Sequence, residues 1–386
     1  MMKKCSVIYV GLSGFPIGFA MIAKIVLISK ALQYIGLSTL VINRKLSDES
    51  QYEGQYKGIR YTSVFNKRIH GSFLKRRFYN TILPFLEWKK ISSEIKKNEV
   101  KYVIVNSRDL FQLILYFLLS RKHRTKLLIT YVELGSAMIT SSRKVYINNF
   151  LFEKYAFRIV DGALPISEHL IQIIRKQNSN LPILKTPVLL DFEEIDAIKT
   201  DRIENKFLFC GSAAFIEVLR MIIHSFELVK NDGTRLTLVC GGTLDETEAL
   251  NAIIMRSPKK DKIDLLQKLS YSQLIENYKT SLALLIPLRP TIQDKARFPH
   301  KIGEYAASSR PIISNNWGEV TNYFEDNKSA FLAEKYTPES IAAKMNFVIE
   351  NCDKAKEVGK AGRKVAELYF DYKKYSKQIK EYLESI

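Results

Sequence analysis

The segment FPHKIGEYAASSRPIISN, residues 298–315, says most about the fold and function of this chain. Pro299 suits the first turn of a helix, and the apolar run after Arg310 predicts a buried strand. On that helix Lys301 and Glu304 are three residues apart, so they share a face near the end that can meet a ligand. A lysine there can neutralise a leaving phosphate, and a carboxylate can accept hydrogen bonds from sugar hydroxyls. The alternative is an ordinary exposed ion pair at a helix start.

Short apolar strands alternate with helical stretches along the whole chain. A first series predicts strands over 6–10, 37–43, 102–106, 126–131 and 162–165, with a helix over about 20–34. The pattern pauses over 181–195. A second series then predicts strands over 206–210, 236–240, 282–287 and 311–314, with helices over about 215–230 and 301–307. Such alternation indicates an α/β protein with parallel, doubly wound sheets.

The length of 386 residues exceeds what one hydrophobic core usually organises, so we expect two domains. We assign residues 1–190 to the first domain and 191–365 to the second. Residues 366–386 are predicted to form a helix that returns to the first domain. Residues 51–100 give no legible pattern, because basic clusters there outweigh the periodicity.

The excess positive charge lies in the first domain. The chain has 59 Lys and Arg against 40 Asp and Glu, a net charge of +19. Residues 1–190 hold 30 basic and 11 acidic residues, whereas residues 191–386 hold 29 of each. An excess of this size indicates an anionic partner: a nucleic acid, a membrane surface or a phosphorylated small molecule.

Cysteine and histidine spacing argues against a structural metal site and a secretory disulfide framework. The four cysteines are scattered and the five histidines lie far apart, which fits the cytoplasm. The uncharged run over 5–23 follows two lysines, as in a signal peptide, and is long enough to cross a bilayer. However, three glycines and a proline interrupt it, which favours a strand, a glycine loop and a helix.

The glycine loop GLSGFPIGFA, residues 11–20, is a candidate for ligand binding. Small residues let backbone amides approach a ligand, and the following helix presents its positive end to an anion. The glycine spacing matches neither the dinucleotide fingerprint nor the Walker loop. A turn that needs glycine only for its geometry is the alternative.

The segment 298–313 resembles the donor-binding region of glycosyltransferases with the GT-B fold, particularly the retaining family 4 enzymes. Many of them carry Phe-Pro-x-Lys-x-x-Glu-Tyr-x-Ala-x-x-x-Pro-Val-Ile. The glycine loop with its following helix and strand resembles the family's opening, and FLFCGS (residues 207–212) resembles the strand that opens the second domain. The resemblance implies two Rossmann-like domains facing across a cleft, with C-terminal helices packing back toward the first.

The resemblance also implies roles for individual residues. Glu304 would contact the ribose or the diphosphate edge of a nucleotide-sugar, while Lys301 and Arg289 would hold the diphosphate. Further donor contacts are expected at Gly14, Gly18, Gly211 and Ser212. No cofactor or metal ion is expected, because basic side chains and helix N-termini stabilise the leaving group in this fold.

Two features depart from the family pattern. The family places a first Glu eight positions before the second, where this chain has Ala296. The basic residues that usually follow the first strand of the second domain are absent from CGSAAFIEV, residues 210–218. We expect Arg289, Arg297 or Lys301 to supply the missing charge, and a degenerate, inactive domain is the alternative.

On the acceptor side, Glu133 follows a strand where such folds place a polar residue toward the cleft. We therefore name it, with Glu304 and Lys301, as a candidate catalytic residue; Asn106 has a similar position. The alternative for Glu133 is pairing with one of the many nearby bases. Ser167 is predicted to cap the helix that begins after it.

Basic clusters at 67–78, 89–90, 96–97 and 121–126 are interleaved with aromatic and apolar residues. No recognised nucleic-acid module is present, so we expect no nucleic-acid partner. The mixture suits a peripheral protein on an anionic membrane, and a merely solvated basic face is the alternative.

These features together predict a glycosyltransferase that moves a sugar from a nucleotide-sugar to a glycan or lipid-linked acceptor. By the resemblance it retains the anomeric configuration, and it acts in bacterial surface polysaccharide biosynthesis on the inner face of the cell membrane. The alternatives are a sugar-nucleotide epimerase of the same fold and a catalytically silent nucleotide-sugar or glycan-binding protein.

Overall fold

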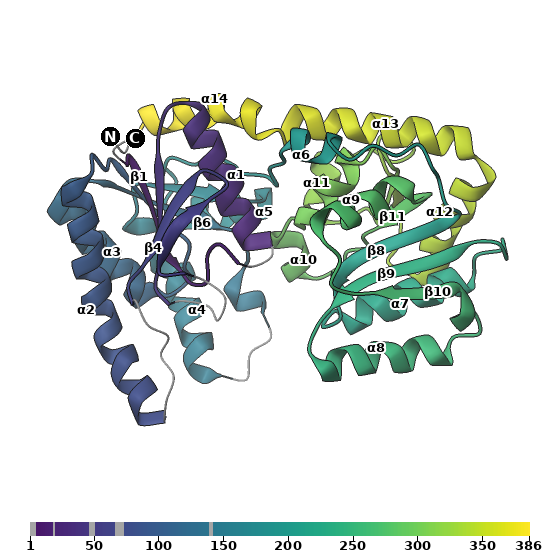
Figure 1. Cartoon of the computed structure of the whole chain (residues 1–386), viewed down its shortest axis with the longest axis horizontal. Coiled ribbons are helices and arrows are strands. Elements are labelled where there is room, and N and C mark those ends of the chain that lie inside the picture. The colour runs from purple at the N-terminus through teal and green to yellow at the C-terminus, as the bar shows by residue number, and fades with distance from the viewer. Residues whose placement is uncertain (1–4, 18–19, 46–50, 66–72, 139–141) are drawn as a thin grey trace. The chain divides into compact units, whose positions relative to one another are not determined.

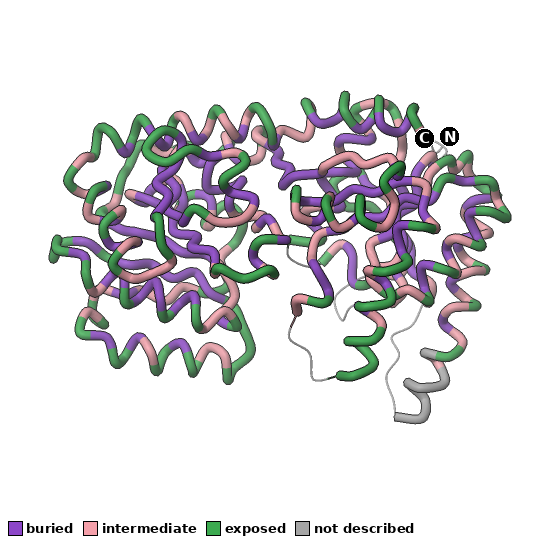
Figure 2. The backbone as a smooth tube through the Cα atoms, turned by 180° about the vertical axis from the view of Figure 1, so that it is seen from behind, coloured by how far each residue is buried: buried purple, intermediate pink, exposed green. Residues whose placement is uncertain are grey.

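The computed structural model describes residues 5–17, 20–45, 51–65, 73–138 and 142–386. The chain divides into two compact units (Figure 1). The first unit consists of Met1–Leu189 together with Tyr372–Ile386, and the second of Leu190–Asp371. In both units most strands are buried while the outer sides of the helices are exposed (Figure 2).

The first unit is built on a seven-stranded sheet in the order β3-β4-β2-β1-β5-β6-β7. Its strands are β1 (Val7–Leu12), β2 (Thr39–Asn43), β3 (Glu53–Tyr56), β4 (Ile59–Ser63), β5 (Tyr102–Val105), β6 (Lys126–Tyr131) and β7 (Gly162–Pro165). Every neighbouring pair is parallel except β3 and β4, which form an antiparallel hairpin. Lys57 and Gly58 have φ angles of 48° and 80°, as a two-residue hairpin turn requires.

Helices cover this sheet: α1 (Ala20–Tyr34), α2 (Phe73–Lys97), α3 (Leu110–His123), α4 (Arg143–Tyr155), α5 (Glu168–Gln177) and α14 (Tyr372–Glu384). The C-terminal helix α14 packs on α1, and its Tyr375 and Ile379 belong to the core shared with β1. Ser167 caps α5 as predicted, because its hydroxyl accepts a hydrogen bond from the Leu170 N–H at 3.3 Å.

The second unit has a six-stranded, wholly parallel sheet in the order β10-β9-β8-β11-β12-β13. The strands are β8 (Lys206–Ser212), β9 (Arg235–Gly241), β10 (Ile263–Leu266), β11 (Ala283–Leu285), β12 (Ile312–Asn315) and β13 (Phe331–Ala333). The helices are α6 (Phe192–Asp196), α7 (Ile216–Glu227), α8 (Leu244–Arg256), α9 (Tyr271–Thr280), α10 (Ile292–Ala296), α11 (His300–Ala307), α12 (Pro338–Glu350) and α13 (Cys352–Tyr369).

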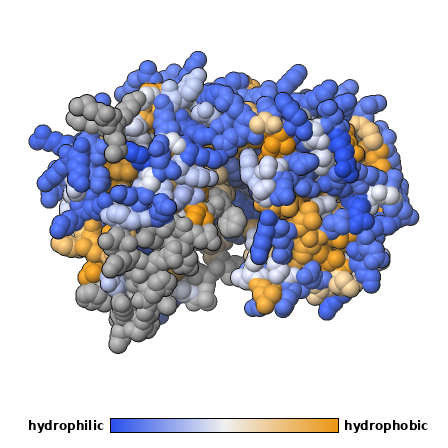
Figure 3. Space-filling model, viewed as in Figure 1, coloured by the Kyte–Doolittle hydropathy of each residue, from blue (hydrophilic) through white to orange (hydrophobic). Residues whose placement is uncertain are grey.

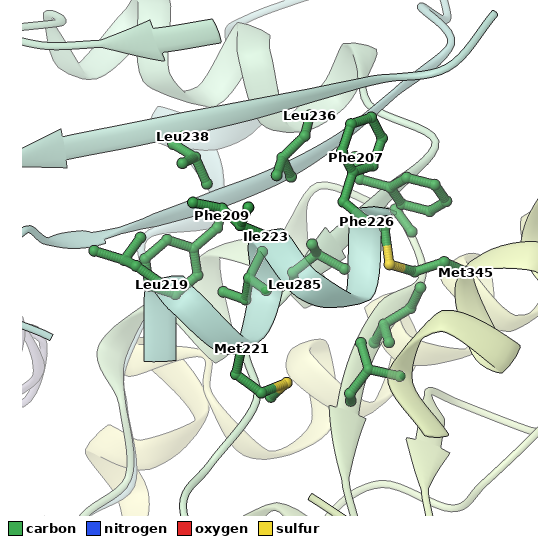
Figure 4. Packing of buried hydrophobic residues seen from close by; sticks show 14 of the residues in the cluster. Phe207, Phe209, Leu219, Met221, Ile223, Phe226, Leu236, Leu238, Leu285 and Met345 are labelled. Carbon is green, nitrogen blue, oxygen red and sulfur yellow. The ribbon is translucent and has the colours of Figure 1, made fainter. Parts of the chain in front are cut away.

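The core of the second unit forms where side chains from the sheet meet α7 and α12. Phe207 of β8 lies beside Phe226 of α7 and Met345 of α12, whereas Phe209 of β8 lies near Leu219 of α7 (Figure 4). All five are buried. Alternate residues of β8 and β9 face this layer, as the two-residue period of a strand requires.

Most predicted strands are present within one or two residues of their expected ends. The region 51–100, which gave no legible pattern, contains the β3–β4 hairpin and the long helix α2, with Pro84 inside it. The strand predicted over 282–287 is shorter, because β11 spans only Ala283–Leu285. None of the helices in the described part of the chain combines the length and hydropathy needed to span a membrane.

Candidate functional site

The order of strands in the second unit points to one edge of its sheet. β8 and β11 are neighbours, but the chain leads from β8 toward β9 on one side and from β11 toward β12 on the other. In open parallel sheets, ligands bind beyond the carboxyl ends of strands at such a switch point. The residues that follow β8 and β11 are therefore the first to consider.

A buried carboxylate organises the loop after β11. Asp294 of α10 is fully buried and accepts three hydrogen bonds from Arg289: from its backbone N–H at 2.8 Å, from Nε at 3.1 Å and from Nη2 at 2.9 Å. Nη2 of Arg297 lies 3.0 Å from the same carboxylate. The hydrogen bonds to Asp294 raise the pKa of Arg289. Two guanidinium groups are thus held side by side.

The same two guanidinium groups lie over an aromatic ring. Phe215 belongs to the turn between β8 and α7, and its ring centre is 6.0 Å from the guanidinium carbon of Arg289 and 4.9 Å from that of Arg297. Cations over a ring face are attracted by its quadrupole. The turn after β8 has no basic residue of its own, and two arginines from further along the chain bring positive charge to it.

Lys301 and Glu304 pair with one another on α11. The ammonium of Lys301 lies 2.9 Å from Oε2 of Glu304, and the Tyr278 hydroxyl donates to that oxygen at 3.4 Å. Nε2 of His300 is 3.8 Å from the other carboxylate oxygen. The Glu304 side chain is only 6% exposed, whereas that of Lys301 keeps 31%. The pair therefore differs from an ordinary exposed ion pair at a helix start. Its carboxylate is buried, and its lysine reaches the surface.

Contacts with the end of β8 fix α11 in place. The hydroxyl of Tyr305 accepts a hydrogen bond from the Cys210 N–H at 2.8 Å. Lys301 also contacts the Cys210 thiol. Burial disfavours the ammonium of Lys301, but the charge of Glu304 and the Cys210 thiol outweigh that cost and raise the pKa of Lys301. The lysine is therefore a cation at neutral pH beside the carboxyl end of β8.

An asparagine holds the loop after β11 from the neighbouring strand. Asn315, at the end of β12, accepts a hydrogen bond from the Leu288 N–H at 2.7 Å and donates one to the Leu288 carbonyl at 2.9 Å. Leu288 directly precedes Arg289, so this clamp fixes the backbone from which the arginine projects. Asn43 does the same in the first unit, where it bonds both backbone groups of Phe15 in the glycine loop.

Gly211 and Ser212, the two residues at the end of β8 that are expected to contact the donor, each have a structural role as well. A Cβ on Gly211 would lie 2.6 Å from the ring of Phe209, so glycine is needed for packing. The Ser212 hydroxyl accepts the Ala214 N–H at 3.2 Å and shapes the turn. Their contact with a donor stays a prediction.

In the first unit, the glycine loop takes a backbone shape that requires glycine. Gly11 and Gly14 have φ angles of 82° and 83°, which side chains rarely allow. A Cβ on Gly11 would also lie 3.0 Å from that of Ser107, in the loop after β5. The geometric explanation of these glycines therefore holds, and a ligand role would come in addition to it. Gly18 lies outside the described residues.

Glu133 lies against a base, as its alternative interpretation expected. Its Oε2 is 3.4 Å from Nη1 of Arg108, and both side chains are more than one-third exposed. Asn106 accepts a hydrogen bond from the Thr130 hydroxyl at 2.8 Å. Both residues follow parallel neighbouring strands, so they share the carboxyl edge of the first sheet. The catalytic role of Glu133 stays a prediction.

Sequence reasoning missed three residues of the second-unit site. Asp294 had one local signal, since it lies three residues before Arg297 on a short helix. Phe215 and Tyr278 had none, because only the folded chain brings them to this edge. In the described part of the chain, no three His, Cys, Asp or Glu side chains form a group that could hold a metal ion.

A comparison with protein families finds one match, which covers most of the second unit. The model of the family described as Glycosyl transferases group 1 matches residues 191–365, so this part of the chain is similar to that family. The assignment to the retaining family 4 stays a prediction. No curated protein matches the chain.

Solved structures resemble the chain over its whole length. HepE (Alr3699) of Anabaena, in complex with UDP, is 14% identical with a TM-score of 0.74, over 99% of this chain and 100% of that one. Sucrose-phosphate synthase of Thermosynechococcus elongatus is 12% identical with a TM-score of 0.77, over 99% of each chain. WaaG, a glycosyltransferase involved in lipopolysaccharide biosynthesis, is 14% identical with a TM-score of 0.63, over 97% of this chain and 99% of its own. The predicted GT-B fold is thereby confirmed.

Proposed function

We propose that this chain is a glycosyltransferase that binds a nucleotide-sugar at the β8–β11 edge of the second unit. The observation that carries the proposal is the arrangement of Arg289, Arg297 and Lys301 around that edge, inside the segment that matches the group 1 family. Three cations suit the diphosphate of such a donor, and Glu304 suits its ribose hydroxyls.

The proposed reaction is the transfer of the sugar to a hydroxyl of a glycan or lipid-linked acceptor. The bond between the sugar C1 and the diphosphate oxygen breaks, and C1 bonds to the acceptor oxygen. The acceptor proton passes to the departing diphosphate. By the resemblance of 298–313 to family 4, the anomeric configuration is retained, with Glu133 on the acceptor side.

The cations supply the stabilisation that this step needs. Negative charge grows on the diphosphate as it leaves, and donors already held in position lower the barrier without reorganisation. Asp294 holds both arginines in this way. We therefore propose that no metal ion is required, and activity in excess EDTA tests that part.

Two features of the neighbours guide the choice of substrates. HepE has been solved with UDP and with UDP-glucose, so UDP-sugars are the first donors to try. WaaG is involved in lipopolysaccharide biosynthesis, which supports a role in bacterial surface polysaccharide assembly. The basic clusters of the first unit are the reason to propose that this role is performed at the cytoplasmic side of the membrane.

A panel of nucleotide-sugars, with thermal shift and nucleotide release as readouts, tests the proposal. We expect one donor class to stabilise the wild type, and Lys301→Ala and Glu304→Ala to abolish that shift. Lys328 and Glu325 form an exposed pair with the same spacing in the same unit, so Lys328→Ala and Glu325→Ala are the matched controls. Absence of any donor-dependent shift would overturn the proposal. Stabilisation without turnover would favour the silent binder, and an epimerised nucleotide-sugar the epimerase.

A further inference from the structure

Helix α3 of the first unit is apolar on its outer side as well as on its buried side. Phe111, Ile114 and Leu118 are 64%, 40% and 50% exposed. Their spacing of three and four residues places them in one stripe along the helix. The opposite side is buried through Leu113, Tyr116 and Leu119, among others. A helix that is apolar all round is expected where both sides are covered.

The neighbouring helix α4 exposes a still larger apolar set. Six of its thirteen residues are large, hydrophobic and at least one-third exposed: Val145, Tyr146, Ile147, Phe150, Leu151 and Tyr155. Only Asn149 and Phe152 are buried. Burial of such residues would contribute about 1.5–3 kcal/mol each, so this exposure is costly unless something covers it.

Contacts between the helices place these residues on one surface. Asn148 of α4 accepts a hydrogen bond from the Leu110 N–H at the start of α3, at 3.1 Å. Near the end of α3, the ammonium of Lys122 lies 5.7 Å from the ring centre of Trp88 in α2. Phe85, one turn before Trp88, is 70% exposed. We call the outward sides of α2, α3 and α4 the α2–α4 face. Apolar atoms reach the surface where α2 and α3 lie (Figures 1 and 3).

The positive charge of α2, α3 and α4 indicates that the partner of the α2–α4 face is anionic. The three helices hold twelve Lys and Arg against three Glu, and α3 has no acidic residue. Arg143 and Lys144 are exposed at the start of α4, and Lys154 lies over the ring of Tyr155 at 5.3 Å. Aromatic rings interleaved with cations match the boundary between anionic phosphate headgroups and acyl chains.

We propose that the α2–α4 face is a docking surface for a lipid bilayer that contains anionic phospholipid. Phe111, Leu118 and Phe150 enter the headgroup–acyl boundary, while the cations meet the phosphates. This locates the membrane interaction on apolar side chains that the basic clusters of the sequence did not indicate. It goes beyond the proposed donor chemistry and does not depend on it.

Vesicle flotation with the full chain tests the proposal. The vesicles are phosphatidylcholine alone or phosphatidylcholine with phosphatidylglycerol. We expect the wild type to bind only the second kind, less at high salt. The double variant Phe111→Ser/Leu118→Ser should bind these vesicles at least about tenfold more weakly, because it lacks the aromatic ring and the aliphatic side chain that enter the bilayer. Arg143→Glu with Lys144→Glu should also weaken binding.

A matched control comes from α8 of the second unit. Leu244 and Met255 are 71% and 65% exposed there, but the helix carries Asp245, Glu246 and Glu248. Leu244→Ser with Met255→Ser should leave vesicle binding unchanged. An unfolding temperature equal to that of the wild type shows that each variant is folded.

Three results would overturn the proposal. The wild type could bind both kinds of vesicle equally or neither kind, or the Phe111→Ser/Leu118→Ser variant could bind vesicles as the wild type does. The third result is a wild type that is a dimer in solution and a variant that is a monomer. The last would assign the face to a second copy of the chain. Donor-dependent thermal shift, measured on the same variants, should stay at the wild-type value. A wild type that binds the vesicles but shows no donor-dependent shift would count against the proposed function alone.

Discussion

Asp294 holds Arg289 by three hydrogen bonds at once, through the backbone N–H, Nε and Nη2, all between 2.8 and 3.1 Å. The carboxylate is fully buried, whereas the arginine side chain keeps 25% of its surface exposed. The carboxylate therefore lies inside the protein, while part of the arginine side chain reaches the surface. Arg297 joins the same carboxylate at 3.0 Å, so a single buried charge orients two cations.

The first prediction concerns stability. Asp294→Ala should lower the free energy of unfolding by about 3 kcal/mol, because two partly buried guanidinium groups lose their counter-charge. Asp264 is the control, since it also pairs with an arginine, Arg235, at 2.6 and 2.8 Å, but on the surface. Asp264→Ala should change the free energy by less than about 1 kcal/mol. Urea unfolding measures both, and equal losses would contradict the account.

The second prediction separates positioning from stability. Asp294→Asn keeps the shape of the side chain but not the charge that orients Arg289 and Arg297. We expect it to weaken nucleoside diphosphate binding about tenfold while the affinity for the nucleoside alone stays the same. Isothermal titration measures the two affinities. Equal weakening of both ligands would mean that Asp294 acts only on the fold.

The third prediction concerns the glycine loop. Gly11 and Gly36 have nearly the same φ, 82° and 86°, but only Gly11 has a close neighbour, Ser107. Gly36→Ala should cost about 1 kcal/mol for the backbone conformation. Gly11→Ala should cost about 2–3 kcal/mol, because the contact with Ser107 adds to it. Urea unfolding compares them, and similar losses would remove the steric argument.

The fourth prediction concerns the pH dependence of stability. Lys24 of α1 has a buried Nζ without a hydrogen-bond partner among the described residues, and burial lowers the pKa of Lys24 to about 7. Between that value and its ordinary 10.5, the unfolded chain binds a proton that the folded chain does not. The free energy of unfolding should therefore rise with pH through this lysine, by at most about 1.4 kcal/mol per pH unit.

Lys24→Met removes the titrating amine, so the free energy of unfolding should rise less steeply with pH. Lys374, which is exposed on α14, provides the control as Lys374→Met. Urea unfolding at several pH values above 7 gives the slopes of the wild type and both variants. A Lys24→Met slope equal to that of the wild type would show that the lysine keeps its proton in the folded chain.

The regular part of the fold could be predicted from the sequence, because buried parallel strands are continuous apolar runs. The runs at 126–131 and 162–165 match β6 and β7 to the residue. The β3–β4 hairpin could not, since β3 is mostly exposed and has no apolar run. Helix α2 was hidden because its basic residues interrupt the apolar period.

The candidate site could be predicted only where its residues are close in the sequence. Lys301 and Glu304 stand on one helix turn, so their pairing follows from spacing. Their burial does not, because it depends on Tyr278, which another helix supplies. Likewise the meeting of Arg289 with Phe215 depends on the adjacency of β8 and β11, which no local pattern records.

The most direct test of the central claim is the affinity of the full chain for nucleoside diphosphates, with UDP first, in the wild type and in Arg289→Ala/Arg297→Ala. The account predicts that at least one nucleoside diphosphate binds the wild type. It also predicts that the double variant binds that ligand at least about tenfold more weakly, with the affinity for the nucleoside unchanged. No binding of any nucleoside diphosphate, or equal binding by the wild type and the double variant, would contradict it.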